Sequence, residues 1–319
     1  MHIFPTSLVA FTLSAAALHA EVPKVVTDTS ITGSLVAQVM GGLGSPDVML
    51  PGNADPHDYQ LKPSQAGAVQ DADLVIWVGP QLSPWLDKAA KNLGKGQSIE
   101  LLNLPATLRE AAPDDHHHEE AEGHDHHHEG DHDDDHAHEG GDGHDHGGLN
   151  PHAWLDPENA RIWLQAIASA LREKDPENAA TYKSNADAAS DAIVKLEDGI
   201  KAQLAPAKGK RFVVQHDAYG YFTNRFGLEP ALTIAASDAT APSAARLREI
   251  KDQLKAEGAV CAFPEYGHDP RLLTAVTEGT PVTLGEALDP DGIGSAAGPS
   301  LYTEMMQSIS NALAACLTQ

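Results

Sequence analysis

Three histidines and one aspartate have the side chains and the setting to bind a single metal ion together. They are His57, His152, His216 and Asp289. Imidazole nitrogens and carboxylate oxygens are ordinary ligands of Zn²⁺, which proteins usually hold in a tetrahedron of four ligands. The spacing is too wide for a zinc finger, so such a site depends on the fold. Each histidine taken alone is explained more simply as a partly buried residue without a metal.

These four residues share a place after a predicted β-strand. His57 lies in the loop after the second predicted strand, and His152 lies between the fourth strand and its helix. His216 ends the first strand of the second half of the chain, and Asp289 follows the last strand. Open parallel sheets bind ligands outside the carboxyl ends of their strands. If two such sheets face each other, the four residues converge in the cleft between them.

Short apolar runs alternate with helical patterns along the whole chain, and this alternation predicts parallel β/α units. Between the fourth and fifth units, apolar side chains recur every three or four residues from Ala179 to Ile200. This pattern predicts a linker helix of about 28 residues, beginning near Pro176 and ending before Pro206. The predicted fold class is α/β, with two (β/α)4 lobes, each around a parallel sheet. The predicted strands are Val25–Asp28, Asp47–Leu50, Asp73–Gly79, Ser98–Leu102, Arg211–His216, Ala231–Ala236, Gly258–Phe263 and Pro281–Gly285.

The predicted organisation has four parts. Residues 1–20 hold no acidic residue and carry an apolar run too short to span a bilayer, which is typical of a cleavable secretory signal. A buried N-terminal helix is the alternative. Residues 21–175 are the predicted N-terminal lobe, 176–205 the linker helix and 206–319 the C-terminal lobe. No other segment approaches the length and apolar character of a membrane span, so we expect an exported protein that is not inserted in the membrane.

A histidine-rich segment at residues 114–147 interrupts the N-terminal lobe. It contains 12 of the 18 histidines and 14 carboxylates, but no Lys or Arg. With no apolar periodicity and much glycine, it is predicted to be a disordered surface loop that binds several Zn²⁺ ions weakly and passes them to the cleft. A solvated acidic linker with incidental histidines is the alternative. The accessory ligands would be His116, His117, His118, His124, His126, His127, His128, His132, His136, His138, His144 and His146.

The overall charge is strongly negative. There are 21 Lys and Arg residues against 46 Asp and Glu residues, which gives a net charge of −25. This balance argues against binding to nucleic acid or to an anionic membrane surface, because both repel such a protein. It suits a soluble protein that attracts cations.

The chain has two cysteines, Cys261 and Cys316. An even count in an exported protein predicts one disulfide, and two free buried thiols are the alternative. The loop that this disulfide would close has about 55 residues, for which the chain-entropy model gives at most roughly 4 kcal/mol of stabilisation.

Four stretches of the chain resemble the metal-binding proteins of zinc and manganese ABC importers. They are PHDYQLKPSQ, ADLVIWVGP, NPHAWLDPENA and VVQHDAYGYF, and the resemblance extends from Val25 to Cys316. It implies two (β/α)4 lobes joined by a long rigid helix, with one metal between them. It also implies that the two cysteines pair as a disulfide, and that a permease and an ATPase complete the importer.

The same resemblance carries the family's three histidine ligands onto His57, His152 and His216. Manganese members usually have Glu where this chain has His216, and a carboxylate suits Mn²⁺ better, so zinc is favoured here. Asp289 matches the fourth ligand of some members, and Glu265 or water are the alternatives. His268 is interpreted as a residue that joins a loop to a helix.

The sequence is therefore interpreted as a monomeric periplasmic protein that captures Zn²⁺ and delivers it to an ABC transporter permease for high-affinity zinc uptake. The alternatives are a manganese-importer binding protein, a zinc buffer or chaperone without a transporter, and a zinc-dependent hydrolase. No GxSxG or HExxH motif is present, and a fourth protein ligand would close the coordination position that a hydrolase needs. We therefore do not expect an enzyme.

Overall fold

The computed structural model of the chain describes residues 21–52, 54–57, 59–111, 148–235 and 243–319. The predicted signal segment (1–20) and the whole histidine-rich segment (114–147) lie outside the described residues. The expectations for these two segments are therefore not tested by the structure.

The first half of the chain forms a parallel four-stranded sheet in the order β2-β1-β3-β4. The side chains of the central strand β3 alternate between two cores: Leu74 and Ile76 pack into one, and Val75 and Trp77 into the other. Both faces of the sheet are therefore covered, as expected for parallel strands. The strands are β1 (Val25–Thr27), β2 (Asp47–Val48), β3 (Leu74–Trp77) and β4 (Gln97–Glu100), and the helices are α1 (Ser30–Met40), α2 (Pro63–Asp71), α3 (Pro84–Asn92) and α4 (Pro157–Lys174).

The second half repeats this arrangement with a sheet in the order β6-β5-β7-β8, again with all strands parallel. The predicted fold class of two α/β lobes with parallel sheets is confirmed. Most of the strands are shorter than predicted, although β5 and β7 end at the predicted residues and β4 begins one residue earlier. They are β5 (Phe212–His216), β6 (Leu232–Ala235), β7 (Cys261–Phe263) and β8 (Thr283–Leu284), and the helices are α6 (Gly220–Phe226), α7 (Ala244–Glu257), α8 (Arg271–Thr277) and α9 (Leu301–Leu317).

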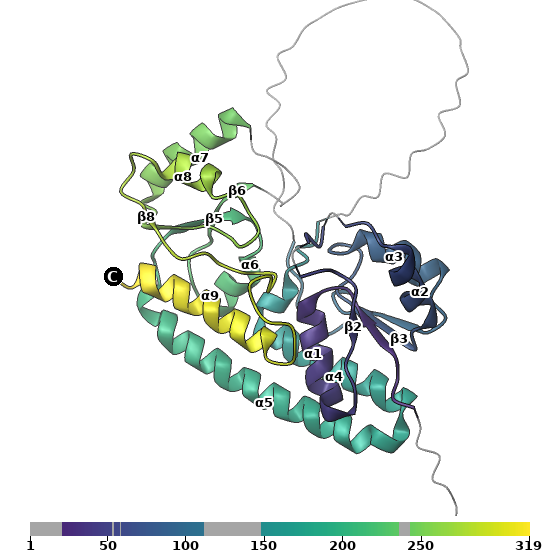
Figure 1. Cartoon of the computed structure of the whole chain (residues 1–319). Helices are drawn as coiled ribbons and strands as arrows, with labels where there is room; N and C mark the ends of the chain where they lie inside the picture. Colours follow the sequence, from purple (N-terminus) through teal and green to yellow (C-terminus); the bar gives the residue numbers. More distant parts are fainter. Residues whose placement is uncertain (1–20, 53, 58, 112–147, 236–242) are drawn as a thin grey trace, which may run out of the picture.

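A long helix, α5 (Ala179–Leu204), lies beneath both lobes, with α9 alongside it (Figure 1). Short 3₁₀ turns at Pro176–Asn178 and Ala205–Ala207 flank it, so the regular helix is slightly shorter than predicted. One apolar cluster extends from β1 through α4 and α5 to β5 and α9. The lobes are therefore joined by a continuous core as well as by a single helix.

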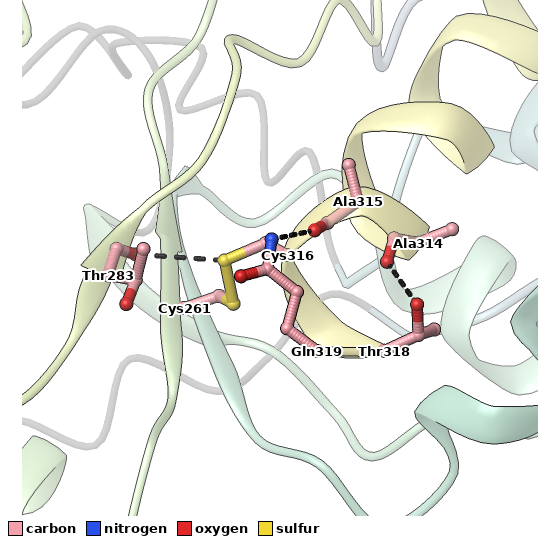
Figure 2. Close-up of a disulfide and its surroundings, with 7 residues drawn as sticks. All are labelled: Cys261, Thr283, Ala314, Ala315, Cys316, Thr318 and Gln319. Atoms are coloured by element: carbon pink, nitrogen blue, oxygen red, sulfur yellow. Dashed lines mark hydrogen bonds between the residues drawn. A yellow bond between two sulfur atoms is a disulfide. The ribbon is translucent and has the colours of Figure 1, made fainter.

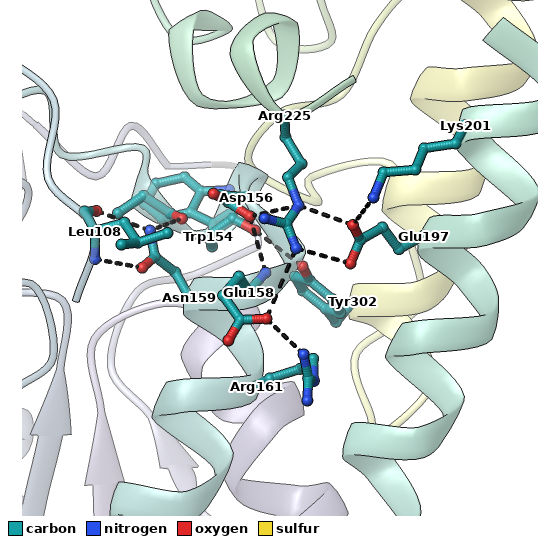
Figure 3. A network of polar contacts seen from close by, with 11 residues as sticks. Leu108, Trp154, Asp156, Glu158, Asn159, Arg161, Glu197, Lys201, Arg225 and Tyr302 are labelled. Carbon is teal, nitrogen blue, oxygen red and sulfur yellow. Dashed lines mark hydrogen bonds and ion pairs between the residues drawn. The ribbon is translucent and has the colours of Figure 1, made fainter. Parts of the chain in front are cut away.

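A polar network lies where α4, α5 and α6 meet (Figure 3). The Arg225 guanidinium on α6 binds both oxygens of Glu197 on α5, at 2.9 and 3.0 Å. It also lies 3.3 Å from the carboxylate of Asp156, which caps the N-terminus of α4. Lys201 binds Glu197 from the next turn of α5. Glu197 therefore places a buried carboxylate on the inner face of α5. Arg225 of α6 and Lys201 of α5 balance its negative charge.

Cys261 on β7 and Cys316 near the end of α9 form the predicted disulfide (Figure 2). The two residues are 55 positions apart in the sequence. The bond therefore fastens the last helix, which packs on α5, to an inner strand of the second sheet.

Within the described parts of the chain, no helix combines the length and the apolar character needed to cross a membrane.

Candidate metal site

Both sheets have the strand order that places a ligand-binding crevice at a defined point. In β2-β1-β3-β4 the order reverses between β1 and β3, and in β6-β5-β7-β8 it reverses between β5 and β7. Ligands of open α/β sheets bind outside the strand ends at such reversals. His216 is the last residue of β5, and Glu265 follows β7 by two residues. These two residues therefore occupy the reversal point of the second sheet.

The equivalent point of the first sheet holds Asp28, which is fully buried. Its carboxylate accepts hydrogen bonds from the backbone N–H of Thr29 at 2.8 Å and of Val78 at 2.9 Å, and from the Ser83 hydroxyl at 3.0 Å. Burial raises the pKa of Asp28, and these hydrogen bonds work against that rise. Asp28 therefore ties the ends of β1 and β3 together at the reversal point of the first sheet.

His152 is held by the turn that precedes α4. Asn150 Oδ1 accepts a hydrogen bond from the backbone N–H of His152 at 3.0 Å and lies 2.9 Å from its ring Nδ1. Tyr221 fixes this turn because its hydroxyl donates to the carbonyl of Asn150 at 3.0 Å. Since Oδ1 is an acceptor, it selects the tautomer of His152 with the proton on Nδ1. The lone pair of Nε2 then faces His216 of the other lobe.

His216 is held in the same manner from the other lobe. Its Nδ1 lies 2.5 Å from Glu265 Oε2, and both side chains are buried. Glu265 Oε1 accepts the backbone N–H of Gln215 at 3.2 Å, which fixes the carboxylate. This pairing puts the proton on Nδ1 of His216 and leaves a lone pair on Nε2, which faces Nε2 of His152. A carboxylate or carbonyl oxygen on the far ring nitrogen is the usual arrangement for a metal-binding histidine.

The two Nε2 atoms lie 3.4 Å apart. Two nitrogens bound to one tetrahedral Zn²⁺ at about 2.0–2.1 Å are separated by about 3.3–3.4 Å. His152 and His216 come from opposite lobes, before α4 and at the end of β5. The fold therefore brings two predicted ligands to the spacing that one zinc ion requires.

His57 approaches from the loop between β2 and α2. Its ring centroid is 5.5 Å from that of His152, and its side chain is partly exposed. Trp85 anchors the loop by donating its indole N–H to the carbonyl of Pro56 at 2.8 Å. His57 thus lies on the side of His152 that is nearer to solvent.

Asp289 is buried in the loop after β8. Its two oxygens accept backbone N–H bonds from Ile293 and Gly294, each at 2.8 Å. Burial raises its pKa although these bonds lower it. Trp154 connects this loop to the other lobe, because its indole N–H donates to the carbonyl of Pro290 at 2.8 Å and its ring lies 5.2 Å from that of His152. Each oxygen of Asp289 retains a further lone pair that can bind a cation.

The electrostatics of the cluster keep His152 neutral. Burial, followed by the proximity of His216 and His57, holds the pKa of His152 well below 6.5. A zinc ion therefore meets an imidazole that is already deprotonated, so no proton has to leave His152 before Nε2 can bind the ion.

His268 lies in the loop before α8, as predicted, but its closeness to His216 was not predicted. Its ring centroid is 5.9 Å from that of His216, and His216, Glu265 and His268 each offer a ligand atom within 4.8 Å of the others. The signal in the sequence was Gly267, whose φ of +81° allows the tight turn after Glu265. Glu265, expected only as an alternative ligand, instead binds the Nδ1 side of His216.

Comparison with known proteins identifies the family to which the chain is similar. A family model described as "Zinc-uptake complex component A periplasmic" matches residues 25–316. The chain is 55% identical over 322 residues to the high-affinity zinc uptake system protein ZnuA of Paracoccus denitrificans, covering 99% of each chain. It is 40% identical to the ZnuA protein of Brucella suis, covering 90% of this chain and 89% of that one.

Among solved structures, the laminin-binding protein Lmb of Streptococcus agalactiae superposes with a TM-score of 0.72 at 23% identity. The superposition covers 92% of this chain and 99% of that one. At this level of identity the likeness supports the two-lobed fold.

Proposed function

Because this chain belongs to the ZnuA family of periplasmic zinc-uptake components, we propose that it captures one Zn²⁺ between its two lobes and releases it to the permease of an ABC importer. It is a zinc-binding protein of high-affinity zinc uptake. The finer points proposed here are the residues that bind the ion, the partner that receives it, and the periplasm as the place where the mature chain works as a monomer.

The observation that carries this proposal is the 3.4 Å separation between Nε2 of His152 and Nε2 of His216. His57 adds a third imidazole beside His152. We propose Asp289 as the fourth ligand, because its buried carboxylate is oriented by Ile293 and Gly294. A bound Zn²⁺ would compensate the cost of burying that negative charge.

The other polar residues of the site position these ligands. Asn150 and Glu265 bind Nδ1 of His152 and of His216, so both rings present Nε2 to the ion. Backbone contacts hold both positioning residues, Asn150 through His152 and Glu265 through Gln215, so we propose that these two rings are oriented before zinc arrives. Four protein ligands leave no open position for a reacting water, and we therefore propose a binding role without catalysis.

Delivery requires the two lobes to open slightly. The continuous core along α5 and α9 limits this movement to a small change. We propose that residues 21–175 and 206–319 act as the two lobes and residues 176–205 as the helix that links them. Docking on the permease would separate His216 and Asp289 from His57 and His152, because each pair comes from a different lobe.

The experiment that tests the proposed function is a competitive Zn²⁺ titration of the mature chain with residues 115–146 deleted. We expect one tightly bound zinc per chain, weakened by His216→Ala. Loss of tight binding on deleting the segment would move the principal site into the histidine-rich segment. Tighter binding of Mn²⁺ than of Zn²⁺ would favour a manganese importer instead.

A further inference from the structure

A second group of metal-binding side chains shares one histidine with the proposed zinc site. His216, Glu265 and His268 offer ligand atoms that all lie within 4.8 Å of one another. His216 and Glu265 are buried, whereas His268 is partly exposed. The group therefore leads from the interior of the site toward solvent.

A tight turn holds His268 in this position. The backbone N–H of His268 donates to the carbonyl of Glu265 at 3.3 Å, and Gly267 has the positive φ that the third position of a type II turn requires. Tyr266 N–H donates to the carbonyl of Leu288 at 2.9 Å, which fastens the turn to the loop that carries Asp289. A side chain other than glycine at position 267 would strain this backbone.

His216 turns different nitrogens toward His152 and toward Glu265. Nε2 of His216 faces His152 at 3.4 Å, whereas Nδ1 faces Glu265 at 2.5 Å. A neutral imidazole has a lone pair on only one nitrogen at a time. An ion bound through Nε2 and an ion bound through Nδ1 of a neutral His216 therefore exclude each other.

We propose that His268, Glu265 and Nδ1 of His216 form an outer zinc position that an ion occupies briefly on its way into and out of the inner position. This inference rests on the proposed function. Two imidazole nitrogens and one carboxylate oxygen form a normal donor set for Zn²⁺, and three protein ligands leave a position open to water. The open position and the exposure of His268 let the ion exchange quickly.

An ion bound briefly at the outer position changes the rates of zinc loading and release but does not change the affinity of the inner position. It lowers the barrier between solvent and the inner position in both directions, and the free energies of the two end states stay the same. Removing the outer position should therefore slow loading and release by the same factor.

The test uses the full-length mature chain loaded with one equivalent of Zn²⁺. Transfer of zinc to an excess of a chromogenic chelator gives the rate constant of release. Competition with a chelator at equilibrium gives Kd. The release rate constant divided by Kd gives the rate constant of loading. In His268→Gln we expect both rates to fall about tenfold, with Kd within about threefold of the parent.

Two further variants separate this role from a local structural one. His268→Glu restores a zinc-binding group, so it should recover most of the lost rate. Tyr266→Phe alters the same turn without touching a ligand, so it should behave like the parent.

Three results are decisive. Rates in His268→Gln equal to those of the parent would overturn the outer position. Affinity more than about tenfold weaker at an unchanged loading rate would also overturn it, because His268 would then be a ligand of the resting site. Absence of any tightly bound zinc in the parent would instead contradict the proposed function itself.

Discussion

Nε2 of His152 and Nε2 of His216 face each other at 3.4 Å across the two lobes, although the residues are 64 positions apart in the sequence. Each ring is held from behind by an oxygen, of Asn150 and of Glu265 respectively. Two lone pairs aimed at one point are unfavourable for each other in the absence of a cation. The arrangement is therefore prepared for an ion that both nitrogens can bind.

Removing either facing imidazole should weaken zinc binding strongly. Mutation of a residue that only orients a metal ligand typically weakens metal binding by about 10–100-fold. Loss of a direct ligand should therefore weaken zinc binding by more than about 100-fold. Competitive titration of His152→Ala and His216→Ala, in the chain lacking residues 115–146, measures this. A change under tenfold in either variant would remove that residue from the ligand set.

The hydrogen bond that His152 Nδ1 donates to Asn150 Oδ1 should contribute to zinc affinity although Asn150 does not contact the ion. Asn150→Ala frees the ring to rotate and to change tautomer, and we expect about 10–100-fold weaker zinc binding. Asn150→Asp keeps an acceptor at the same place and should stay close to the parent. An equal loss of zinc affinity in the two variants would mean that the Asn150 amide stabilises the turn and does not orient the His152 ring.

Stability of the zinc-free protein should fall as the solution becomes acidic. Burial and the neighbouring His216 and His57 hold the pKa of His152 well below 6.5, whereas the unfolded chain protonates this ring near pH 6.5. Below about pH 6.5 the unfolded state binds more protons, so the free energy of unfolding decreases until the folded pKa is reached. Urea midpoints measured between about pH 7.5 and 5.5 test this. His152→Gln should show a shallower decline, and an identical decline in the two proteins would refute the assignment.

Arg225 should be important for stability because it balances charge among three helices. Arg225→Met leaves Asp156 without its cationic partner and leaves Glu197 with Lys201 alone. The free energy of unfolding should fall by roughly 2–4 kcal/mol. The loss is smaller than for a fully buried ion pair because Arg225 is partly exposed. Lys183→Ala is the matched control: its ion pair with Asp187 is exposed on the same helix α5, and its loss should change stability by about 0.5 kcal/mol or less. Urea unfolding of both variants gives the comparison. Similar costs for the two would show that the Arg225 network adds nothing beyond a surface ion pair.

The disulfide should stabilise the fold and leave the metal site intact. Replacing both Cys261 and Cys316 with Ser removes a constraint on a loop of about 55 residues, and the expected loss is up to about 4 kcal/mol. Both residues lie on the α9 side of the second sheet, away from the strand ends that carry the ligands. Zinc affinity at 25 °C should therefore remain within about threefold of the parent. Thermal unfolding and zinc titration of the double variant measure the two effects separately.

The sequence by itself determined the elements and the edge on which the chemistry lies. β3 is a continuous apolar run, as expected for a parallel strand that is buried on both faces, and apolar residues repeat every three or four positions in α5, as the geometry of a helix requires. Residues that follow parallel strands must lie at one edge of a sheet. The positions of His57, His152, His216 and Asp289 in the chain therefore sufficed to predict a shared site, and two cysteines sufficed to predict one disulfide.

Only the tertiary structure decided which atoms face each other. Glu265 binds His216 although the two residues are 49 positions apart in the sequence. Glu197 can lie on the buried face of α5, where an apolar residue would be expected, because Arg225 of α6 pairs with it. The turn at Gly267 places His268 beside His216. These contacts depend on how α5 and α9 pack the two lobes together. The periodicity of apolar residues predicts which face of a helix or strand is buried. It does not predict which side chain of a distant element packs against that face. The ring nitrogens that His152 and His216 turn toward each other follow from that packing.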